Sequence, residues 1–142
     1  MIDKKTYYFL SFTWGLLMSV IGLLVAAVLI AREHRPKRFL WGWCFEIGQG
    51  WGGLNLGIVF LCEKGASDNL KCHEFGHSIQ NCVWGAFTPF VVHLPSVARY
   101  HMRNIKAARG EDLPPYDAVW YEGQATRLGL EYYARESVKD EH

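Results

Sequence analysis

The chain is 142 residues long and nearly neutral, with 15 lysine and arginine residues against 14 aspartate and glutamate residues. This length allows a single domain, and the net charge of +1 gives no electrostatic reason to expect a nucleic acid as a partner. Half of the residues are hydrophobic and 15% are aromatic, which is high for a soluble protein of this size, so we expect part of the chain to lie in lipid.

The first element that we predict is a transmembrane helix near the N-terminus. No residue from Thr6 to Ala31 is charged, and Leu16 to Ile30 is almost wholly aliphatic. At about 1.5 Å per residue, such a helix would cross a hydrocarbon core about 30 Å thick. A cleavable signal peptide is the alternative, but the apolar run is longer than a typical signal core and no clear cleavage site follows it. We therefore predict a retained anchor over residues 1–38 and one metal-binding domain over residues 39–142.

Charge and cysteine content both indicate the compartment of the domain. Basic residues after the anchor outnumber those before it, which favours placing the domain on the cytoplasmic side of the membrane. The four cysteines form no CxxC pair and no disulfide-dense pattern, which fits a reducing compartment. The basic residues after the anchor are Arg32, Arg35, Lys37 and Arg38.

The apolar stretch Phe39–Leu61 is predicted to contain a strand and not a second membrane helix. Its six glycines argue against one continuous helix. A turn over Gly48–Gly53 followed by a strand over Leu54–Leu61 explains the pattern better.

A helix is predicted over Lys71–Trp84, because this stretch holds no proline and Asp68 and Asn69 can cap it. It carries the sequence His73-Glu74-Phe75-Gly76-His77. Residues four apart on a helix lie on one face with Cβ atoms about 5 to 6 Å apart, so both imidazoles can reach one ion. The carboxylate of Glu74, beside them, can take a proton from a metal-bound water as general base. The alternative is a chance coincidence on a solvated helix face in a chain with six histidines.

Two histidines leave a catalytic zinc site one protein ligand short, because such sites use three protein ligands and a water. The best candidate is Glu122, in a second predicted helix over Tyr116–Gly129 with Asp117 as its cap. Cys72 is expected to point about 100° away around its helix and to be a small buried residue. The alternative third ligands are Glu46, Glu63 and Glu131.

The two helices together resemble a known family. H-E-x-G-H followed by E-x-x-A-x-x-x-G, here Glu122 to Gly129, resembles the gluzincin class of zinc metallopeptidases, and within it small membrane-anchored zincin-like proteins. The resemblance implies Zn²⁺ held by His73, His77 and Glu122, with Glu74 as the catalytic base. It also implies that the strand before the zinc helix pairs with an extended peptide substrate.

One position departs from the family pattern. Four residues after the third ligand the family usually has an acidic or amide side chain that orients the first histidine, whereas this chain has Thr126. A threonine hydroxyl accepts an imidazole N–H less strongly than a carboxylate does, so metal binding is expected more firmly than catalysis.

The stretch Cys82–Ala98 is apolar enough to suggest a further span. A full crossing would separate the two histidines from Glu122, which must lie on the same side of the bilayer to share an ion. We therefore expect a re-entrant or interfacial helix broken near Pro89 and Pro95, with the basic residues that follow it at the lipid headgroups, or simply at a solvated helix end. Those residues are Arg99, Arg103, Lys106 and Arg109.

The C-terminal third is predicted to hold a loop over Gly110–Pro115 and a charged tail over Glu131–His142 that frays. The group that stabilises negative charge on a reacting carbonyl is not fixed by the sequence. Four side chains can donate the necessary hydrogen bond: His93, His101, Tyr116 and Tyr121.

The predicted fold is therefore mainly helical with a short β element: an N-terminal transmembrane helix, then a minimal zincin-like α+β domain with an interfacial or re-entrant helix. The predicted function is a membrane-anchored zinc-dependent hydrolase, a metallopeptidase whose partners are membrane lipid and a peptide or protein substrate. A zincin-like membrane interaction or scaffold protein without turnover is the main alternative. A metal transporter is a third reading, but the broken apolar segments do not supply several full spans.

Overall fold

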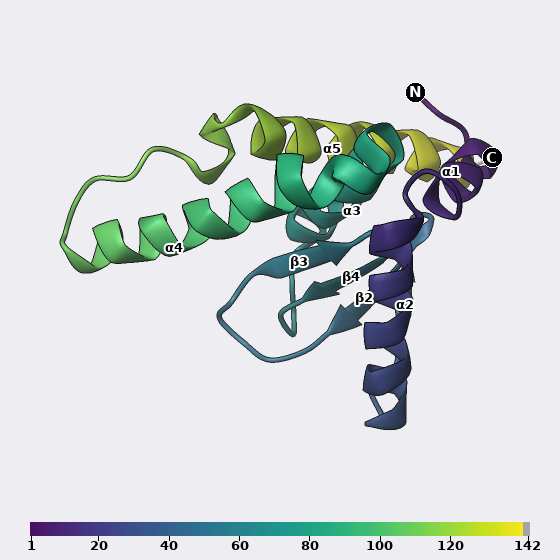
Figure 1. The fold of residues 1–142 in the computed structure, drawn as a ribbon, viewed down its shortest axis with the longest axis horizontal. Coiled ribbons are helices and arrows are strands. Elements are labelled where there is room, and N and C mark those ends of the chain that lie inside the picture. The colour runs from purple at the N-terminus through teal and green to yellow at the C-terminus, as the bar shows by residue number, and fades with distance from the viewer. Residues whose placement is uncertain (141–142) are drawn as a thin grey trace.

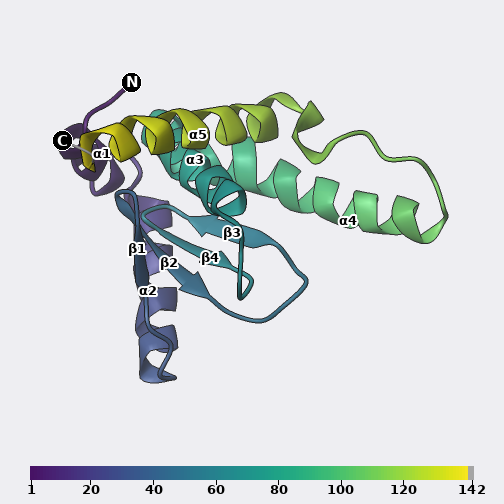
Figure 2. The same ribbon diagram turned by 180° about the vertical axis from the view of Figure 1, so that it is seen from behind.

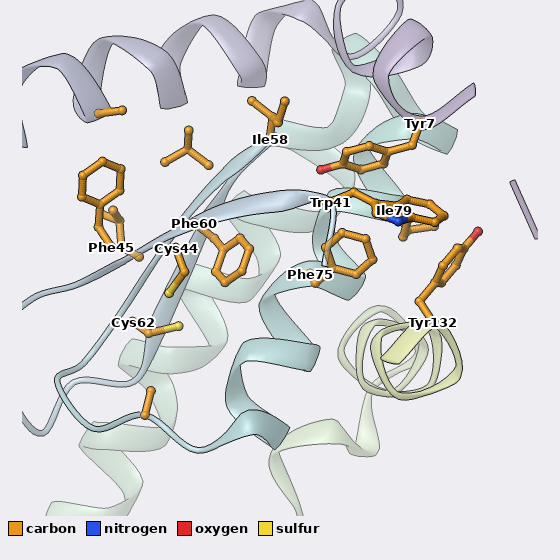
Figure 3. Packing of buried hydrophobic residues seen from close by; sticks show 14 of the residues in the cluster. Tyr7, Trp41, Cys44, Phe45, Ile58, Phe60, Cys62, Phe75, Ile79 and Tyr132 are labelled. Atoms are coloured by element: carbon orange, nitrogen blue, oxygen red, sulfur yellow. The ribbon is translucent and has the colours of Figure 1, made fainter. Parts of the chain in front are cut away.

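A four-stranded mixed sheet lies between helices α2 and α3 in the computed structural model, which describes residues 1–140 (Figures 1 and 3). Helix α5 packs along α3, and the protein is mainly helical with a small sheet, as predicted. In chain order the elements are α1 (Lys4–Ser11), α2 (Leu16–Ala31), β1 (Lys37–Phe39), β2 (Gly42–Glu46), β3 (Gly53–Leu56), β4 (Val59–Cys62), α3 (Asp68–Trp84), η1 (Gly85–Phe87), η2 (Pro89–His93), α4 (Leu94–Ala108), η3 (Tyr116–Ala118) and α5 (Trp120–Asp140).

The apolar N-terminal segment is broken into two helices, so the prediction of one continuous transmembrane helix is wrong. Helices α1 and α2 meet at 86°, and no single helix within residues 1–140 is both long and apolar enough to cross a membrane, although the bent pair together meets that requirement. Long-range contacts fix the corner. The indole N–H of Trp14 donates to the carbonyl of Val83, and a Cβ on Gly15 would lie 2.4 Å from Nδ2 of Asn81.

The sheet has the strand order β1-β2-β4-β3, with a parallel pair β2/β4 at its centre. The predicted single strand Leu54–Leu61 is instead a hairpin in which Leu56 pairs with Val59. Gly57 has φ of +73° in this turn, and its N–H donates to the Asn55 side chain. The chain bends over residues 48–51, within the turn predicted at Gly48–Gly53, but Gly53 already belongs to β3, and β1 and β2 were not predicted.

An aromatic cluster joins the N-terminal helices to the rest of the protein (Figure 3). Tyr7 on α1 and Phe75 on α3 both pack against Trp41, with ring centroids 5.6 Å and 6.0 Å away. Tyr132 on α5 lies 5.1 Å from the same indole. All four rings are buried, so α1, α3 and α5 share one core. The division of the chain at residues 38 and 39 stays a prediction.

Helices α3 and α5 touch through their backbones at two glycines. A Cβ on Gly76 would lie 1.8 Å from the Ala125 carbonyl oxygen, and one on Gly129 would lie 1.8 Å from that of Cys72. No side chain fits at either position, so glycine alone allows this approach. The two helices are therefore held at a distance that the backbone sets.

The ends of these helices differ from those predicted. The cap of α3 is Ser67, whose hydroxyl accepts the Leu70 N–H at 3.2 Å, and not Asp68 or Asn69. Helix α5 begins at Trp120, so Asp117 lies before it in η3. The tail predicted to fray is helical to Asp140, and its last two residues lie outside the described part.

The segment Pro89–Pro115, here called the α4 arm, projects from the rest of the protein in both views (Figures 1 and 2). No residue of α4 is buried. The chain breaks before the arm at Gly85, which has φ of +55°, and not at the prolines, which occupy first-turn positions of η2 and α4. The predicted loop at Gly110–Pro115 is confirmed.

Candidate metal centre

Three side-chain atoms from α3 and α5 converge on one point. Nε2 of His73 lies 3.2 Å from Nε2 of His77, and Oε2 of Glu122 lies 3.0 Å and 3.2 Å from the two nitrogens. The sequence placed the histidines on one helix face, and the α3–α5 contact brings Glu122 to them across 45 residues of sequence. This group could hold a metal ion.

The donor set fits zinc in both spacing and chemistry. Ligand atoms at about 2.0 to 2.1 Å from a tetrahedral zinc ion lie about 3.3 Å from one another, close to the separations of 3.0 to 3.2 Å seen here. Two imidazoles and one carboxylate are also a ligand set that catalytic zinc sites use, with a fourth position for water.

Each ligand is oriented from outside by a hydrogen bond. Nδ1 of His77 lies 2.7 Å from Oε1 of Gln80, which can only accept, so Nδ1 carries the proton and Nε2 presents its lone pair. Nδ1 of His73 lies 2.9 Å from the hydroxyl of Thr126, the position at which the sequence departs from the gluzincin pattern that it resembles. Ser96 on α4 donates to Oε1 of Glu122 at 2.5 Å.

Sequence reasoning missed the roles of Gln80 and Ser96. Gln80 follows His77 by three residues on the same helix, a spacing that places the two side chains together and could have indicated the contact. No local signal links Ser96 to Glu122, because the two residues lie on different helices that meet only in the folded chain.

The two glutamates of the site differ in ionisation. Burial opposes the charged form of Glu122, but hydrogen bonds with His73 and His77 outweigh it and lower the pKa of this carboxyl. Burial raises the pKa of Glu74 to about 7, the neighbouring His73 opposes the rise, and Glu122 adds to it. A carboxyl with a pKa near 7 is suited to exchanging protons at neutral pH.

A cavity of about 370 Å³ opens beside His73 and His77. Glu74 lines it and packs against β3, since a Cβ on Gly53 would lie 2.5 Å from the Glu74 carboxylate. One wall is β3 with Leu54 and Asn55, and the facing wall is formed by α4 with Ser96 and neighbouring residues. The cavity thus brings together His73 and His77, Glu74 and an edge strand.

Two of the four candidates for stabilising a reacting carbonyl line this cavity, namely His93 and Tyr116, whereas Tyr121 and His101 do not. Nε2 of His93 is buried and finds no hydrogen-bond partner among the described residues. Burial, and then the neighbouring His77, lower the pKa of His93 to about 4, so its ring is neutral at pH 7. His93 ends the π-helical turn η2, a distortion that often marks functional sites.

The alternative third ligands lie elsewhere. Glu46 forms ion pairs with Lys37 and Lys71, and Glu131 pairs with Arg127 on an exposed surface. Glu63 accepts two backbone N–H groups of the loop before β3. Cys72 is buried outside the ligand group, as predicted, and all four cysteines are buried free thiols.

The chain matches no protein-family model, and neither a curated protein nor a solved structure is significantly similar to it. The case for a function therefore rests on the chemistry of the site.

Proposed function

We propose that this protein is a membrane-associated, zinc-dependent metallopeptidase. The observation that carries the proposal is the ligand triangle of His73, His77 and Glu122 beside Glu74, at a cavity that runs along an edge strand. The gluzincin resemblance of the motifs supports the same assignment.

The proposed chemistry divides among four residues. A zinc ion, when bound, supplies a Lewis acid that lowers the pKa of water to about 7 and polarises a carbonyl. His73, His77 and Glu122 hold the ion. Glu74 accepts the proton of the attacking water and passes it to the leaving amine, a role for which its raised pKa is suited.

The edge strand β3 is the proposed docking site for an extended peptide. Among the residues that the structure describes it pairs with β4 alone, so its other edge has backbone groups available for a substrate strand. Gly53, Leu54 and Asn55 line the cavity, which brings a peptide added at this edge past Glu74. This arrangement favours an unfolded or flexible peptide segment over a folded protein surface.

His93 is the proposed hydrogen-bond donor to the carbonyl oxygen under attack. Its buried Nε2 lacks a partner, and a neutral imidazole can donate one hydrogen bond from that atom. Removing one such donor costs about a hundredfold or more in turnover in well-studied hydrolases. His93→Phe is therefore expected to lower turnover strongly while zinc stays bound.

Membrane association is proposed from the exposed apolar surface of α2. Leu24, Val28 and Ile30 are each more than half exposed on a helix without a charged residue. Soluble proteins usually expose apolar side chains singly, whereas here they form one continuous surface along a helix. The bent α1–α2 pair is the proposed anchor, and the flanking basic residues favour the cytoplasmic side for the site.

The test uses two variants of the purified full chain. The wild type is expected to carry one zinc ion per chain and to cleave an unfolded peptide. Glu74→Gln should retain zinc and lose cleavage, whereas His73→Ala should lose zinc. The absence of stoichiometric zinc in the wild type, or an unchanged zinc content in His73→Ala, would overturn the metal site.

A non-catalytic membrane scaffold is the second candidate, favoured by Thr126 in place of a stronger acceptor for His73. A scaffold needs the zinc ion only for structure. In that case Glu74→Gln would leave the cellular role unchanged and no peptide would be cleaved by the wild type.

A further inference from the structure

A second cavity, of about 270 Å³, lies on the side of α4 away from β3. Three of its lining residues are basic and lie one helical turn apart, Arg99, Arg103 and Lys106. No acidic side chain lines it. The remaining lining residues are Pro95, Ala98 and Met102 of α4, Leu113 and Pro114 of the following loop, and Tyr121 of α5.

The two arginines are held in place by backbone carbonyls of the loop after α4. Arg99 donates to the carbonyls of Pro115 and Tyr116 at 3.1 and 3.2 Å, and Arg103 donates to that of Pro114 at 2.5 Å. Both guanidinium groups also lie over the Tyr116 ring. Carbonyls and an aromatic face orient a guanidinium but do not neutralise its charge.

No ion pair among residues 1–140 offsets the positive charge of this cavity. None of the ion pairs that these residues form includes Arg99, Arg103 or Lys106. Nε of Arg99 is buried and has no hydrogen-bond partner in the same part of the chain. A bound anion would accept a hydrogen bond from this buried N–H and pair with the three basic side chains.

Phosphate is the anion that this arrangement suits best, because guanidinium groups bind its oxygens through paired N–H donors and lysine adds a point charge. The surroundings indicate the form of that phosphate. Met102 lines the cavity yet is 58% exposed, and Leu94 and Ile105 on the same helix are 64% and 53% exposed. A soluble phosphate gains nothing from apolar side chains at the rim of its site. The acyl chains of a phospholipid, in contrast, can pack against them.

We propose that this cavity binds the phosphate of an anionic phospholipid, with the exposed apolar residues of α4 entering the lipid beside it. The sequence led us to expect these basic residues at the lipid headgroups or at a solvated helix end, and the cavity turns the first of these expectations into a discrete phosphate site. It does not depend on zinc or on catalysis. Because Arg103 also lines the cavity next to Glu74, a bound headgroup would place that cavity at the membrane surface.

The experiment is flotation of the full chain with vesicles of phosphatidylcholine alone and with vesicles that also contain phosphatidylglycerol. The variant combines Arg99→Gln, Arg103→Gln and Lys106→Gln. Its matched control removes the same charge from α5 by Arg127→Gln, Arg135→Gln and Lys139→Gln. A basic residue near an anionic surface contributes about 1 kcal/mol, so the α4 variant should lose about a hundredfold of the wild type's preference for phosphatidylglycerol. The control should keep that preference.

Three results would overturn the proposal. An equal loss in both variants would mean that net charge and not the cavity drives binding. Equal wild-type affinity for the two kinds of vesicle would exclude an anionic headgroup. Calorimetric binding of inorganic phosphate as tight as that of vesicles would make the ligand a soluble phosphate. Lys106→Glu changes a single exposed residue, so it repeats the vesicle test with little risk to folding. Zinc content and helicity show whether each variant is folded.

Discussion

The α3–α5 pair and the α4 arm meet at the same site but are held in different ways. In the pair, two glycines allow backbone contact, and Glu122 is fully buried. In the arm, no residue of α4 is buried, and its apolar side chains point outward. The arm nevertheless supplies Ser96 to the Glu122 carboxylate and His93 to the cavity.

This difference indicates that the two regions have different roles at the site. The atoms proposed to hold the metal are positioned by a rigid contact between two helices. Ser96, which bonds to Glu122, and His93, which lines the cavity, are instead carried by an element with little packing of its own, which is the kind of element that moves most easily. Substitutions in the pair should therefore damage the fold, and those in the arm should change binding while the fold persists.

The largest effect is expected from Gly129→Ala. The added methyl would lie 1.8 Å from the Cys72 carbonyl oxygen, so α3 and α5 must separate. We expect the free energy of unfolding to fall by about 3 kcal/mol, measured by urea denaturation, and zinc to be lost with it. Ala134→Leu adds more volume at an exposed position of α5 and should change little. A stable, zinc-bound Gly129→Ala protein would show that the helix contact is not rigid.

A smaller effect on the fold, but a clear one on the metal, is expected from Ser96→Ala. The change removes the 2.5 Å hydrogen bond to Glu122. Loss of such an outer partner typically weakens metal binding by about 10- to 100-fold, which competition with a chelator would measure. Ser137→Ala, which removes a hydroxyl bonded only to its own helix, is the control. Unchanged zinc affinity would mean that the arm does not support the ligand.

Thr126 tests a hydrogen-bond partner of a candidate ligand within the α3–α5 pair, as Ser96 does in the arm. Replacing it with Val removes the hydroxyl that lies 2.9 Å from Nδ1 of His73, whereas Asp offers a stronger acceptor. Zinc affinity should rise in the order Val, Thr, Asp, over a total range of about tenfold to a hundredfold. Equal zinc affinities in the three proteins would mean that Thr126 has no role in metal binding.

The smallest effect on stability is expected on the outer face of the arm. Leu94→Gln and Ile105→Gln replace exposed side chains, so the free energy of unfolding should change by no more than about 0.5 kcal/mol each. Binding to lipid vesicles should fall, since less apolar surface can enter the bilayer. Val138→Gln on α5, equally exposed, serves as the control. A large loss of stability would mean that this face packs against the protein.

Local patterns predicted the parts of the site that depend on helical spacing. The distance between His73 and His77 follows from one helical turn, and Glu122 could be chosen from its own helix pattern. The contact between these helices depends on Gly76 and Gly129, whose role becomes visible only once the carbonyls opposite them are known. For the same reason Ser96 could not be found.

The fold was harder to predict where distant contacts override local preference. An uncharged apolar run predicts one helix, but Trp14 and Gly15 bind the far end of α3 and turn the chain. Strands β1 and β2 are only three and five residues long, and Leu40 between them has φ of +50°, so no extended alternation marks them. The hairpin turn at Gly57 was missed because it lies within an apolar stretch that resembles a single strand.

The hydrogen bonds between Ile2 and Tyr132 have a consequence for how the chain reaches this structure. They join residues 130 positions apart, and Tyr132 also closes the aromatic cluster around Trp41. Contacts of such long sequence separation slow folding, because a long loop must close before they form. During synthesis, α3 is made well before α5 can cover it. Until α5 docks, the nascent chain therefore lacks the Tyr132 ring that packs on Phe75 and the Glu122 carboxylate that meets both histidines.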